Sequence, residues 1–94
     1  MMTDRISRTL EIVNKRGLHA RASSKFAMLV GDYPDCAIRV SREDQEVDGD
    51  SIMDLMMLAA GIGSTIEVAA EGVRAVEALD ALSALVADRF GEGD

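Results

Sequence analysis

The sequence predicts a two-layer α+β domain in which three helices cover one face of a mainly antiparallel sheet, with the elements in the order βαββαβα. Two observations lead to this fold. Apolar and polar residues alternate in four short segments, as in half-buried strands, and apolar residues recur every three or four positions in three others, as in amphipathic helices. With 94 residues, 48% of them apolar, the chain is long enough for one core. We therefore expect a single domain, residues 1–94, with its core at about 5–89.

The first strand and the first helix are expected on either side of a loop that contains Gly17. Residues 6–13 alternate and predict the strand, and residues 14–18 form the loop. The helix that follows carries its apolar stripe at Ala22, Phe26, Leu29 and Val30. Residues 31–35 hold both a glycine and a proline, which end this helix.

The middle of the chain predicts two strands and a second helix. Residues 36–40 alternate, and residues 45–48 form a short, weak strand. The second helix begins at Ser51 and ends at the glycines of residues 61–63. One side of it is expected to carry Ile52, Leu55, Met56 and Ala59. Ser51 and Asp54 have the spacing of a capping box, with aspartate in place of the preferred glutamate.

A fourth strand and a third helix complete the predicted fold. Residues 65–70 alternate, and a glycine break separates them from a helix that runs from about residue 74 to residue 89. The apolar stripe of this helix is expected at Val76, Leu79, Leu82, Val86 and Phe90. Gly91 is placed to end the helix, and the tail, residues 91–94, reads as disordered.

The charge distribution excludes one class of partner and singles out one segment. The net charge is −7 and the isoelectric point is near 4.5, so the chain lacks the basic face that a nucleic acid requires, and no nucleic-acid partner is expected. Residues 12–31 nevertheless contain four of the ten basic residues and no acidic one. This cationic segment surrounds His19, the only histidine, and it predicts a site for an anion.

Cysteine content and hydropathy argue against a disulfide, a zinc site and a membrane span. Cys36 is the only cysteine, so no intrachain disulfide forms, a zinc site of cysteine and histidine lacks ligands, and no metal is expected. Catalysis by Cys36 with His19 is conceivable, but alternation with Ile38 and Val40 favours a buried, inert thiol. Since no apolar run could span a bilayer and no signal-peptide core is present, we expect a cytoplasmic protein without membrane insertion.

The position of His19 suggests a chemistry that its residue type alone does not, because a lone histidine most often has no chemical role. A helix start offers unpaired N–H groups and a partial positive charge, which disfavour an imidazolium and leave a ring nitrogen free as a nucleophile. A phosphoryl group there could accept hydrogen bonds from the N–H groups of Ala20 and Arg21 and a contact from the Arg21 side chain. Gly17 would let the preceding loop approach without a Cβ.

The active-site motif of the HPr family resembles the run Gly17-Leu18-His19-Ala20-Arg21. HPr is the phosphocarrier of the phosphoenolpyruvate-dependent phosphotransferase system. The resemblance extends from about residue 5 to residue 89 and includes the element order and a second motif, Ser51-Ile52-Met53. It implies an open-faced β-sandwich with a four-stranded antiparallel sheet, and a monomeric carrier without a cofactor rather than an enzyme.

The resemblance also implies a direction of transfer and an acceptor. Enzyme I would pass a phosphoryl group from phosphoenolpyruvate to His19, Arg21 would stabilise it, and an enzyme IIA domain would receive it. The family usually has a proline after the motif arginine, where this chain has Ala22. Alanine also fits a first helical turn, so we expect the histidine chemistry to be retained. The variant resembles nitrogen-type and proteobacterial members, which leaves open whether the acceptor serves sugar uptake or nitrogen-type regulation.

Ser51 has two interpretations. It is the expected N-cap of the second helix, a role that suits serine. In the family, the matching serine is an ATP-dependent regulatory phosphorylation site in species that have HPr kinase/phosphorylase, which would then be a third partner. A phosphate at a helix start is compatible with the fold, whereas Asp48, Asp50 and Asp54 around Ser51 make the setting less favourable.

The second helix cannot bury all of its apolar residues, because Ile52 and Met56 share one side and Met53 and Met57 another. Exposed methionine suits the recognition of several partners. By resemblance, Ile52, Met53 and Met56 match the family's contact patch beside the histidine. Arg21 and Lys25 would lie at its rim and meet acidic partner surfaces.

Two other functions compete with the phosphocarrier. The chain could be a regulatory binding module controlled through Ser51, with histidine transfer secondary. It could also be a small enzyme that uses His19 as a general base, but the sequence supplies no nucleophile, metal or cofactor loop for it.

Overall fold

The strands form one antiparallel sheet in the order β1-β4-β2-β3. The computed structural model describes residues 5–92. The strands are β1 (Arg5–Glu11), β2 (Cys36–Arg42), β3 (Gln45–Asp48) and β4 (Thr65–Gly72). Pairing of β4 with both β1 and β2 sets Leu10 opposite Ile66 and Val40 opposite Val68. The predicted four-stranded antiparallel sheet is therefore confirmed.

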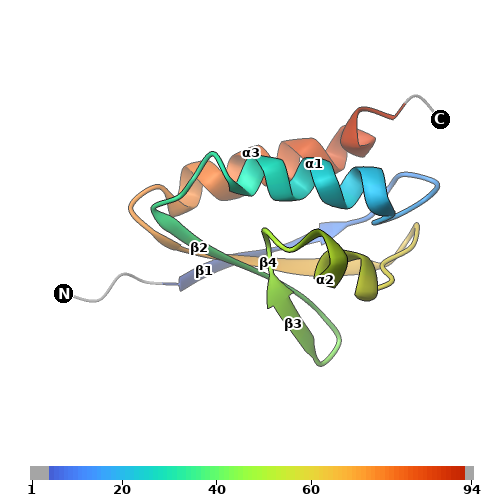
Figure 1. Ribbon diagram of the computed structural model, residues 1–94, viewed down its shortest axis with the longest axis horizontal. Helices are drawn as coiled ribbons and strands as arrows, with labels where there is room; N and C mark the ends of the chain where they lie inside the picture. Colours follow the sequence, from blue (N-terminus) through green and yellow to red (C-terminus); the bar gives the residue numbers. More distant parts are fainter. Residues whose placement is uncertain (1–4, 93–94) are drawn as a thin grey trace.

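The helices are α1 (Ala20–Val30), α2 (Ile52–Met57) and α3 (Ala75–Ala87), and a short 3-10 turn, Arg89–Gly91, follows α3. Figure 1 shows α1 and α3 side by side over the sheet, and α2 packs against α1. The end of the described chain returns to the same end of the molecule as the loop that leads into α1 (Figure 1). The order βαββαβα is as predicted.

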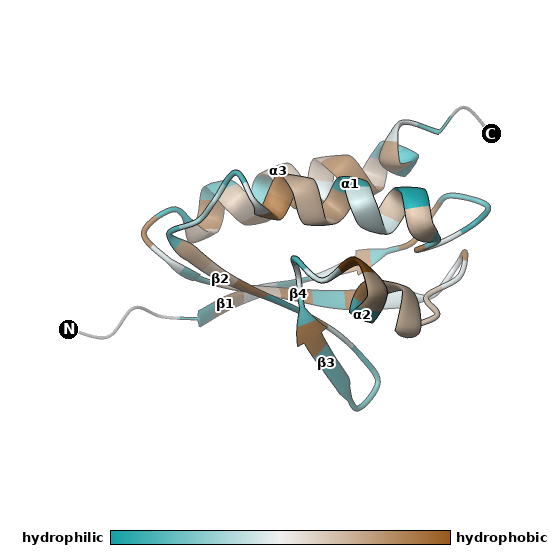
Figure 2. Cartoon of the chain, in the orientation of Figure 1, coloured by the Kyte–Doolittle hydropathy of each residue, from teal (hydrophilic) through white to brown (hydrophobic). Residues whose placement is uncertain are grey.

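The core lies between the helices and the sheet. Its largest fully buried side chains include Phe26, Phe90, Ile12, Leu55, Leu58, Ile66, Leu79 and Leu82. Figure 2 shows apolar stretches on α1, α3 and the strands that enclose this core, whereas the loop before α1 is hydrophilic. Burial of each large apolar side chain contributes roughly 1.5–3 kcal/mol, which is what holds the two helices on the sheet.

The second helix ends earlier than the sequence predicts. It stops at Met57, and Ala59 already has a positive φ of 54°, so the turn begins before the glycines of residues 61–63. Leu55 is the only residue within α2 that is buried, and Leu58 caps the helix from inside the core. Of the residues expected on one side of the helix, Leu55 is buried, whereas Ile52 and Met56 are 39% and 41% exposed.

The third helix also departs from its predicted stripe and end. Val76 is 58% exposed, while Ala75 and Ala78 are buried, because these small side chains let α3 approach the sheet closely. The helix ends at Ala87, and its C-cap is Asp88 rather than Gly91. Phe90 is buried as expected, but it reaches the core from the 3-10 turn with a φ of 56°.

The tail is not disordered as far as the structure describes it. Gly91 lies in the 3-10 turn and Glu92 makes side-chain contacts, so the prediction is wrong for these two residues. Residues 93–94 lie outside the described part.

Candidate phosphoryl-transfer site

The first helix begins at His19, as the sequence predicts. His19 has extended backbone angles, and its Nδ1 accepts the N–H of Arg21 at 3.3 Å, which makes the imidazole the N-cap of α1. The His19 carbonyl accepts the N–H of Ser23 at 2.8 Å, the first bond of the helix. The first turn of α1 carries no acidic residue. No side chain of the first turn therefore offsets the partial positive charge of the helix start, which suits an anion.

The loop before His19 is held by a neighbouring loop. Gly17 has a φ of +65°, and a Cβ on it would lie only 2.3 Å from the carbonyl oxygen of Ala60. That same oxygen accepts the N–H of Leu18 at 3.0 Å. Asn14, which is fully buried, donates from Nδ2 to the Gly17 carbonyl at 2.9 Å. Gly17 therefore serves close packing against the α2–β4 loop, which fixes where His19 stands.

A residue that the sequence analysis missed contacts the imidazole directly. Glu92 Oε2 lies 2.7 Å from His19 Nε2, and Asn14 Nδ2 donates to Glu92 Oε1 at 2.7 Å. The His19 side chain is only 22% exposed as a result. Glu92 escaped notice because it follows a glycine in an acidic tail without periodicity. Phe90, an apolar residue just past the helix, was the signal that this tail is anchored.

The two cationic residues of α1 near His19, Arg21 and Lys25, differ in whether their charged group already has a partner. Ala20 and Arg21 are exposed at the start of α1, and within residues 5–92 no hydrogen bond or ion pair occupies the Arg21 guanidinium. It is free to contact an anion at the helix start. Lys25, expected at the rim of a partner surface, donates instead from Nζ to the Phe90 carbonyl at 2.6 Å. Its ammonium therefore ties α1 to the tail.

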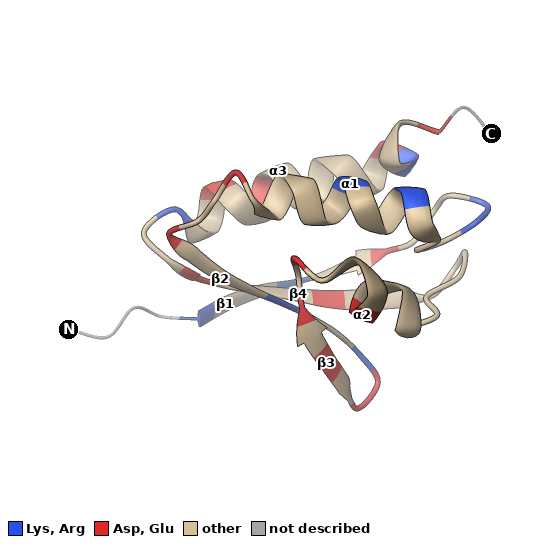
Figure 3. Cartoon of the chain, in the orientation of Figure 1, with Lys and Arg blue, Asp and Glu red and all other residues tan. Residues whose placement is uncertain are grey.

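Ser51 is the N-cap of α2, as predicted. Its Oγ accepts the N–H of Asp54 at 3.4 Å, a long hydrogen bond. The Ser51 N–H donates to the Asp48 carbonyl at 3.3 Å, so it is not available for the reciprocal bond of a capping box. Figure 3 shows acidic residues on β3 and on the segment that leads to α2, and basic residues before and at the start of α1.

The apolar residues of α2 form an exposed patch beside α1, made of Ile52, Met53, Met56 and Met57. Met53 is 74% exposed and Met57 71%, while Ile52 and Met56 are about half as exposed as these two. The prediction that the helix cannot bury all of them is confirmed. A role of this patch in partner binding stays a prediction.

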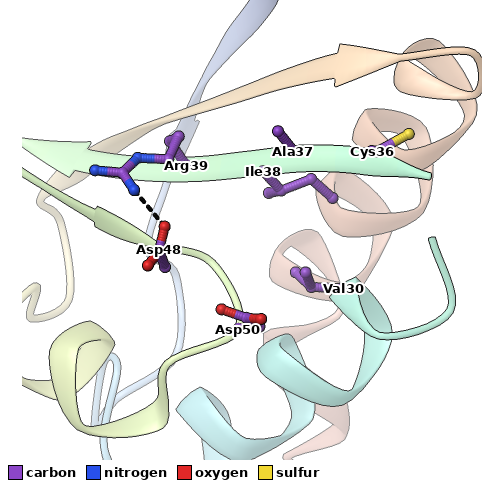
Figure 4. Close-up of a pocket in the computed structure, with 7 residues that line it drawn as sticks. All are labelled: Val30, Cys36, Ala37, Ile38, Arg39, Asp48 and Asp50. Carbon is purple, nitrogen blue, oxygen red and sulfur yellow. Dashed lines mark hydrogen bonds and ion pairs between the residues drawn. The ribbon is translucent and has the colours of Figure 1, made fainter. Parts of the chain in front are cut away.

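Cys36 lies far from His19. It is half-buried at the start of β2, near the end of α1, and it lines a pocket with Arg39, which pairs with Asp48 (Figure 4). Since the eleven residues of α1 rise about 1.5 Å each, roughly 16 Å of helix separates the two ends. Catalysis by Cys36 with His19 is therefore excluded.

Other kinds of site find no support in the described residues. Within residues 5–92, no three histidine, cysteine or carboxylate side chains gather as they would around a metal ion. No helix in this part of the chain is both long and apolar enough to cross a membrane.

Comparison with known proteins agrees with this geometry. The model of the family described as "PTS HPr component phosphorylation site" matches residues 6–88. The chain belongs to the HPr family. It is similar to the phosphocarrier protein HPr of Cupriavidus necator, with 51% identity over 95% of this chain and 99% of the relative. It is also similar to the phosphocarrier protein NPr of Shewanella violacea, with 39% identity over 94% of this chain and 96% of the relative.

A solved structure confirms the fold of the family. The crystal structure of HPr-C-His from Thermoanaerobacter tengcongensis superimposes with a TM-score of 0.88 at 35% identity, over 95% of this chain and 99% of that one. The chain is accordingly a phosphocarrier of the phosphotransferase system that works by histidine phosphotransfer. It is a substrate of enzyme I rather than a catalyst, and its family implies enzyme I and enzyme IIA as partners.

Proposed function

We propose that His19 is the phosphoacceptor and that its Nδ1 carries the phosphoryl group. The observation that supports this choice is that the two ring nitrogens have different partners. Nε2 is occupied by the Glu92 carboxylate at 2.7 Å, whereas Nδ1 points at the start of α1 and has only a long contact, 3.3 Å, with the Arg21 N–H. A long contact is readily exchanged, so Nδ1 can turn its electron pair to phosphorus.

The helix start would then hold the transferred group. The Arg21 N–H released by Nδ1 and the neighbouring Ala20 N–H can donate to the phosphoryl oxygens, and the unoccupied Arg21 guanidinium can add a charge-assisted contact. A charge at an exposed helix end is stabilised by only about 0.3–1 kcal/mol. This weak hold suits a carrier, which must release the group to its next acceptor.

The proposal includes the direction of transfer. Phospho-enzyme I donates to His19, which then donates to an enzyme IIA domain, in the cytoplasm and with the chain as a monomer. The patch of Ile52, Met53 and Met56 is the contact surface for both partners. Sequence identity to relatives called HPr and NPr supports the function of a phosphocarrier. The acceptor could serve sugar uptake or nitrogen-type regulation. Transfer assays with an enzyme IIA of each kind would distinguish these two pathways.

Incubation with phosphoenolpyruvate and enzyme I tests the proposal. The wild-type chain is expected to gain one acid-labile, base-stable phosphate. His19→Ala should abolish the label, and so should His19→Asn, which keeps a good N-cap and therefore the helix start. Equal circular dichroism of the Asn variant and the wild type would exclude unfolding as the cause. Labelling of either variant would overturn the assignment.

A second function, regulatory phosphorylation of Ser51, has one observation in its favour. The Ser51 hydroxyl stands at the start of α2 and is half-exposed, where a phosphate would face unpaired N–H groups. Incubation with ATP and HPr kinase is expected to give an acid-stable phosphate that is absent from Ser51→Ala. If a kinase active on a control HPr gives no label, Ser51 is only a cap.

A further inference from the structure

The residues after α3 form an anchored hook rather than a loose tail. Arg89, Phe90 and Gly91 all have positive φ values, so the chain reverses direction as it leaves the helix. The Phe90 side chain is buried in the core, and its carbonyl accepts the Lys25 ammonium at 2.6 Å. These two contacts fix the position of Glu92, which follows Gly91.

The carboxylate of Glu92 has a partner on each of its two oxygens. Its Oε2 lies on His19 Nε2 and its Oε1 accepts from Asn14 Nδ2, each at 2.7 Å, and its side chain is only 16% exposed. Asn14 is itself buried and is held by its bond to the Gly17 carbonyl. Loop, helix start and tail are thus joined through this one carboxylate.

The two contacts of the imidazole agree on a single protonation state. An ionised carboxylate only accepts hydrogen bonds, so Nε2 carries the hydrogen. The Arg21 N–H only donates, so Nδ1 carries an electron pair. The neutral ring with its hydrogen on Nε2 satisfies both neighbours, and it is the form in which Nδ1 is a nucleophile.

We propose that Glu92 is a positioning residue for phosphoryl transfer: it holds the His19 ring with Nδ1 available and balances the charge that the ring gains. This inference rests on the proposed phosphorylation of His19. The electron pair of Nδ1 forms the new bond to phosphorus, while the bond between phosphorus and the donor atom of phospho-enzyme I breaks and leaves its pair on the donor. Nε2 keeps its hydrogen, so the ring becomes a positively charged phosphoimidazolium.

The place of the carboxylate on the ring suits this role. It lies against Nε2, whereas the Arg21 N–H lies against Nδ1, so the carboxylate opposes the developing positive charge of the ring without occupying the nitrogen that receives the phosphoryl group. A carboxylate hydrogen-bonded to one ring nitrogen of a histidine fixes the tautomer and the orientation of the ring.

Two variants and a matched control test the proposal. Glu92→Ala removes the contact, and Glu92→Gln keeps an acceptor oxygen but removes the charge. Asp88→Asn removes one exposed negative charge from the same end of α3. Heteronuclear NMR of the ring nitrogens and of the Nε2 proton reports the hydrogen bond in the unphosphorylated protein, and steady-state kinetics with enzyme I report the transfer.

The wild type is expected to show one neutral form with a slowly exchanging Nε2 proton. Glu92→Ala should lose that proton signal and lower kcat about tenfold, the lower end of the loss seen when the hydrogen-bond partner of a metal-ligating histidine is removed, while KM for the carrier stays unchanged. Glu92→Gln should recover the proton signal and only part of kcat. Asp88→Asn should match the wild type in both.

The opposite outcomes are equally distinct. An unchanged Nε2 proton and unchanged kcat in Glu92→Ala would overturn the inference, and a higher kcat would mean that the tail shields the histidine instead. Absence of label on the wild type would contradict the proposed function, whereas the ring spectra would still report whether Glu92 holds His19.

Discussion

The starts of α1 and α2 are alike in backbone and opposite in charge. Each helix begins at a side chain that accepts an N–H of the first turn, His19 in α1 and Ser51 in α2, and each cap follows a glycine two residues earlier. The first turn of α1 has no acidic residue, whereas α2 has Asp54 in its first turn. Since both starts present N–H groups, it is charge rather than capping geometry that makes the first the better place for a phosphoryl group.

The two helices also differ in how firmly they are held. Five residues of α1 are buried, and its start is fastened by Gly17 and the tail, whereas α2 has six residues and buries only Leu55. The firmly held helix places the reactive ring, and the short helix presents apolar side chains to solvent. This difference separates the chemistry of the carrier from the recognition of its partners.

Replacing the glycine that precedes each cap, Gly17 or Gly49, should give the largest difference in the free energy of unfolding. Gly17→Ala should lower the free energy of unfolding by at least about 2 kcal/mol, because alanine disfavours a φ of +65° and its Cβ would meet the Ala60 carbonyl oxygen, which belongs to the backbone. Gly49→Ala should cost less, about 1 kcal/mol, because Gly49 does not have the left-handed φ of Gly17 and its Cβ would lie 2.9 Å from a methyl group of Ile38 and 3.2 Å from the Ile38 carbonyl oxygen, a milder overlap than at Gly17. Urea unfolding of both variants measures the difference, and equal losses would contradict the account of the α1 start.

An added acidic residue at the start of α1 should slow phosphorylation of His19, and removal of the acidic residue at the start of α2 should speed phosphorylation of Ser51. Ala20→Glu puts an acid into the exposed first turn of α1 and should slow labelling by phospho-enzyme I about fivefold, as about 1 kcal/mol between like charges at ~4 Å in water implies. Ala20→Gln is the neutral control. Asp54→Asn should speed labelling of Ser51 by HPr kinase. Equal rates for the Glu and Gln variants would show that the charge of the helix start is unimportant.

Loss of the Ser51 cap should have a smaller effect. Ser51→Ala is expected to lower the free energy of unfolding by about 0.5 kcal/mol, the low end of the range for N-caps, because the bond that it removes is long at 3.4 Å. Thermal unfolding at several urea concentrations would resolve it. A loss above about 2 kcal/mol would mean that Ser51 supports more than the first turn of α2.

The smallest expected effect is on the acid dependence of stability, through Asp35, which lies at neither helix start. The Arg74 guanidinium, which lies 3.1 Å from Asp35, holds the pKa of that carboxyl below its usual value through their hydrogen bond. A lowered pKa in the folded state stabilises the protein above the unfolded pKa of about 3.9, and this stabilisation is lost as the pH falls through the folded pKa. Asp35→Asn should therefore lose less stability than the wild type between about pH 5 and pH 2, with unchanged labelling of His19. Parallel titrations would contradict this.

Much of the fold follows from sequence because alternation and helical spacing record which side of an element is buried. The cap at Ser51 follows from residue type next to an apolar run, whereas the sequence placed His19 at a helix start without indicating that its side chain caps the helix. Val76 was misplaced because hydropathy ranks valine above alanine, while the close approach of α3 to the sheet selects the small Ala75 and Ala78. Such a choice depends on the distance between layers, which no local pattern records.

The candidate site was predictable only on its helical side. Gly17, His19 and Arg21 are neighbours in the chain, so a local motif contains them. Asn14 and Glu92 come together across 78 positions through a reversal of the backbone after α3. Nothing in the tail besides Phe90 indicates that reversal, since positive φ values at Arg89 and Phe90 are unusual for these residue types.

The central claim is that the start of α1 and the tail together make Nδ1 of His19 the nucleophile. The most direct test phosphorylates the isotope-labelled protein with phosphoenolpyruvate and enzyme I and measures coupling between phosphorus and each ring nitrogen. Coupling to Nδ1, with the hydrogen retained on Nε2, is the predicted result. Coupling to Nε2 would contradict the account, because that nitrogen would first have to leave the Glu92 carboxylate.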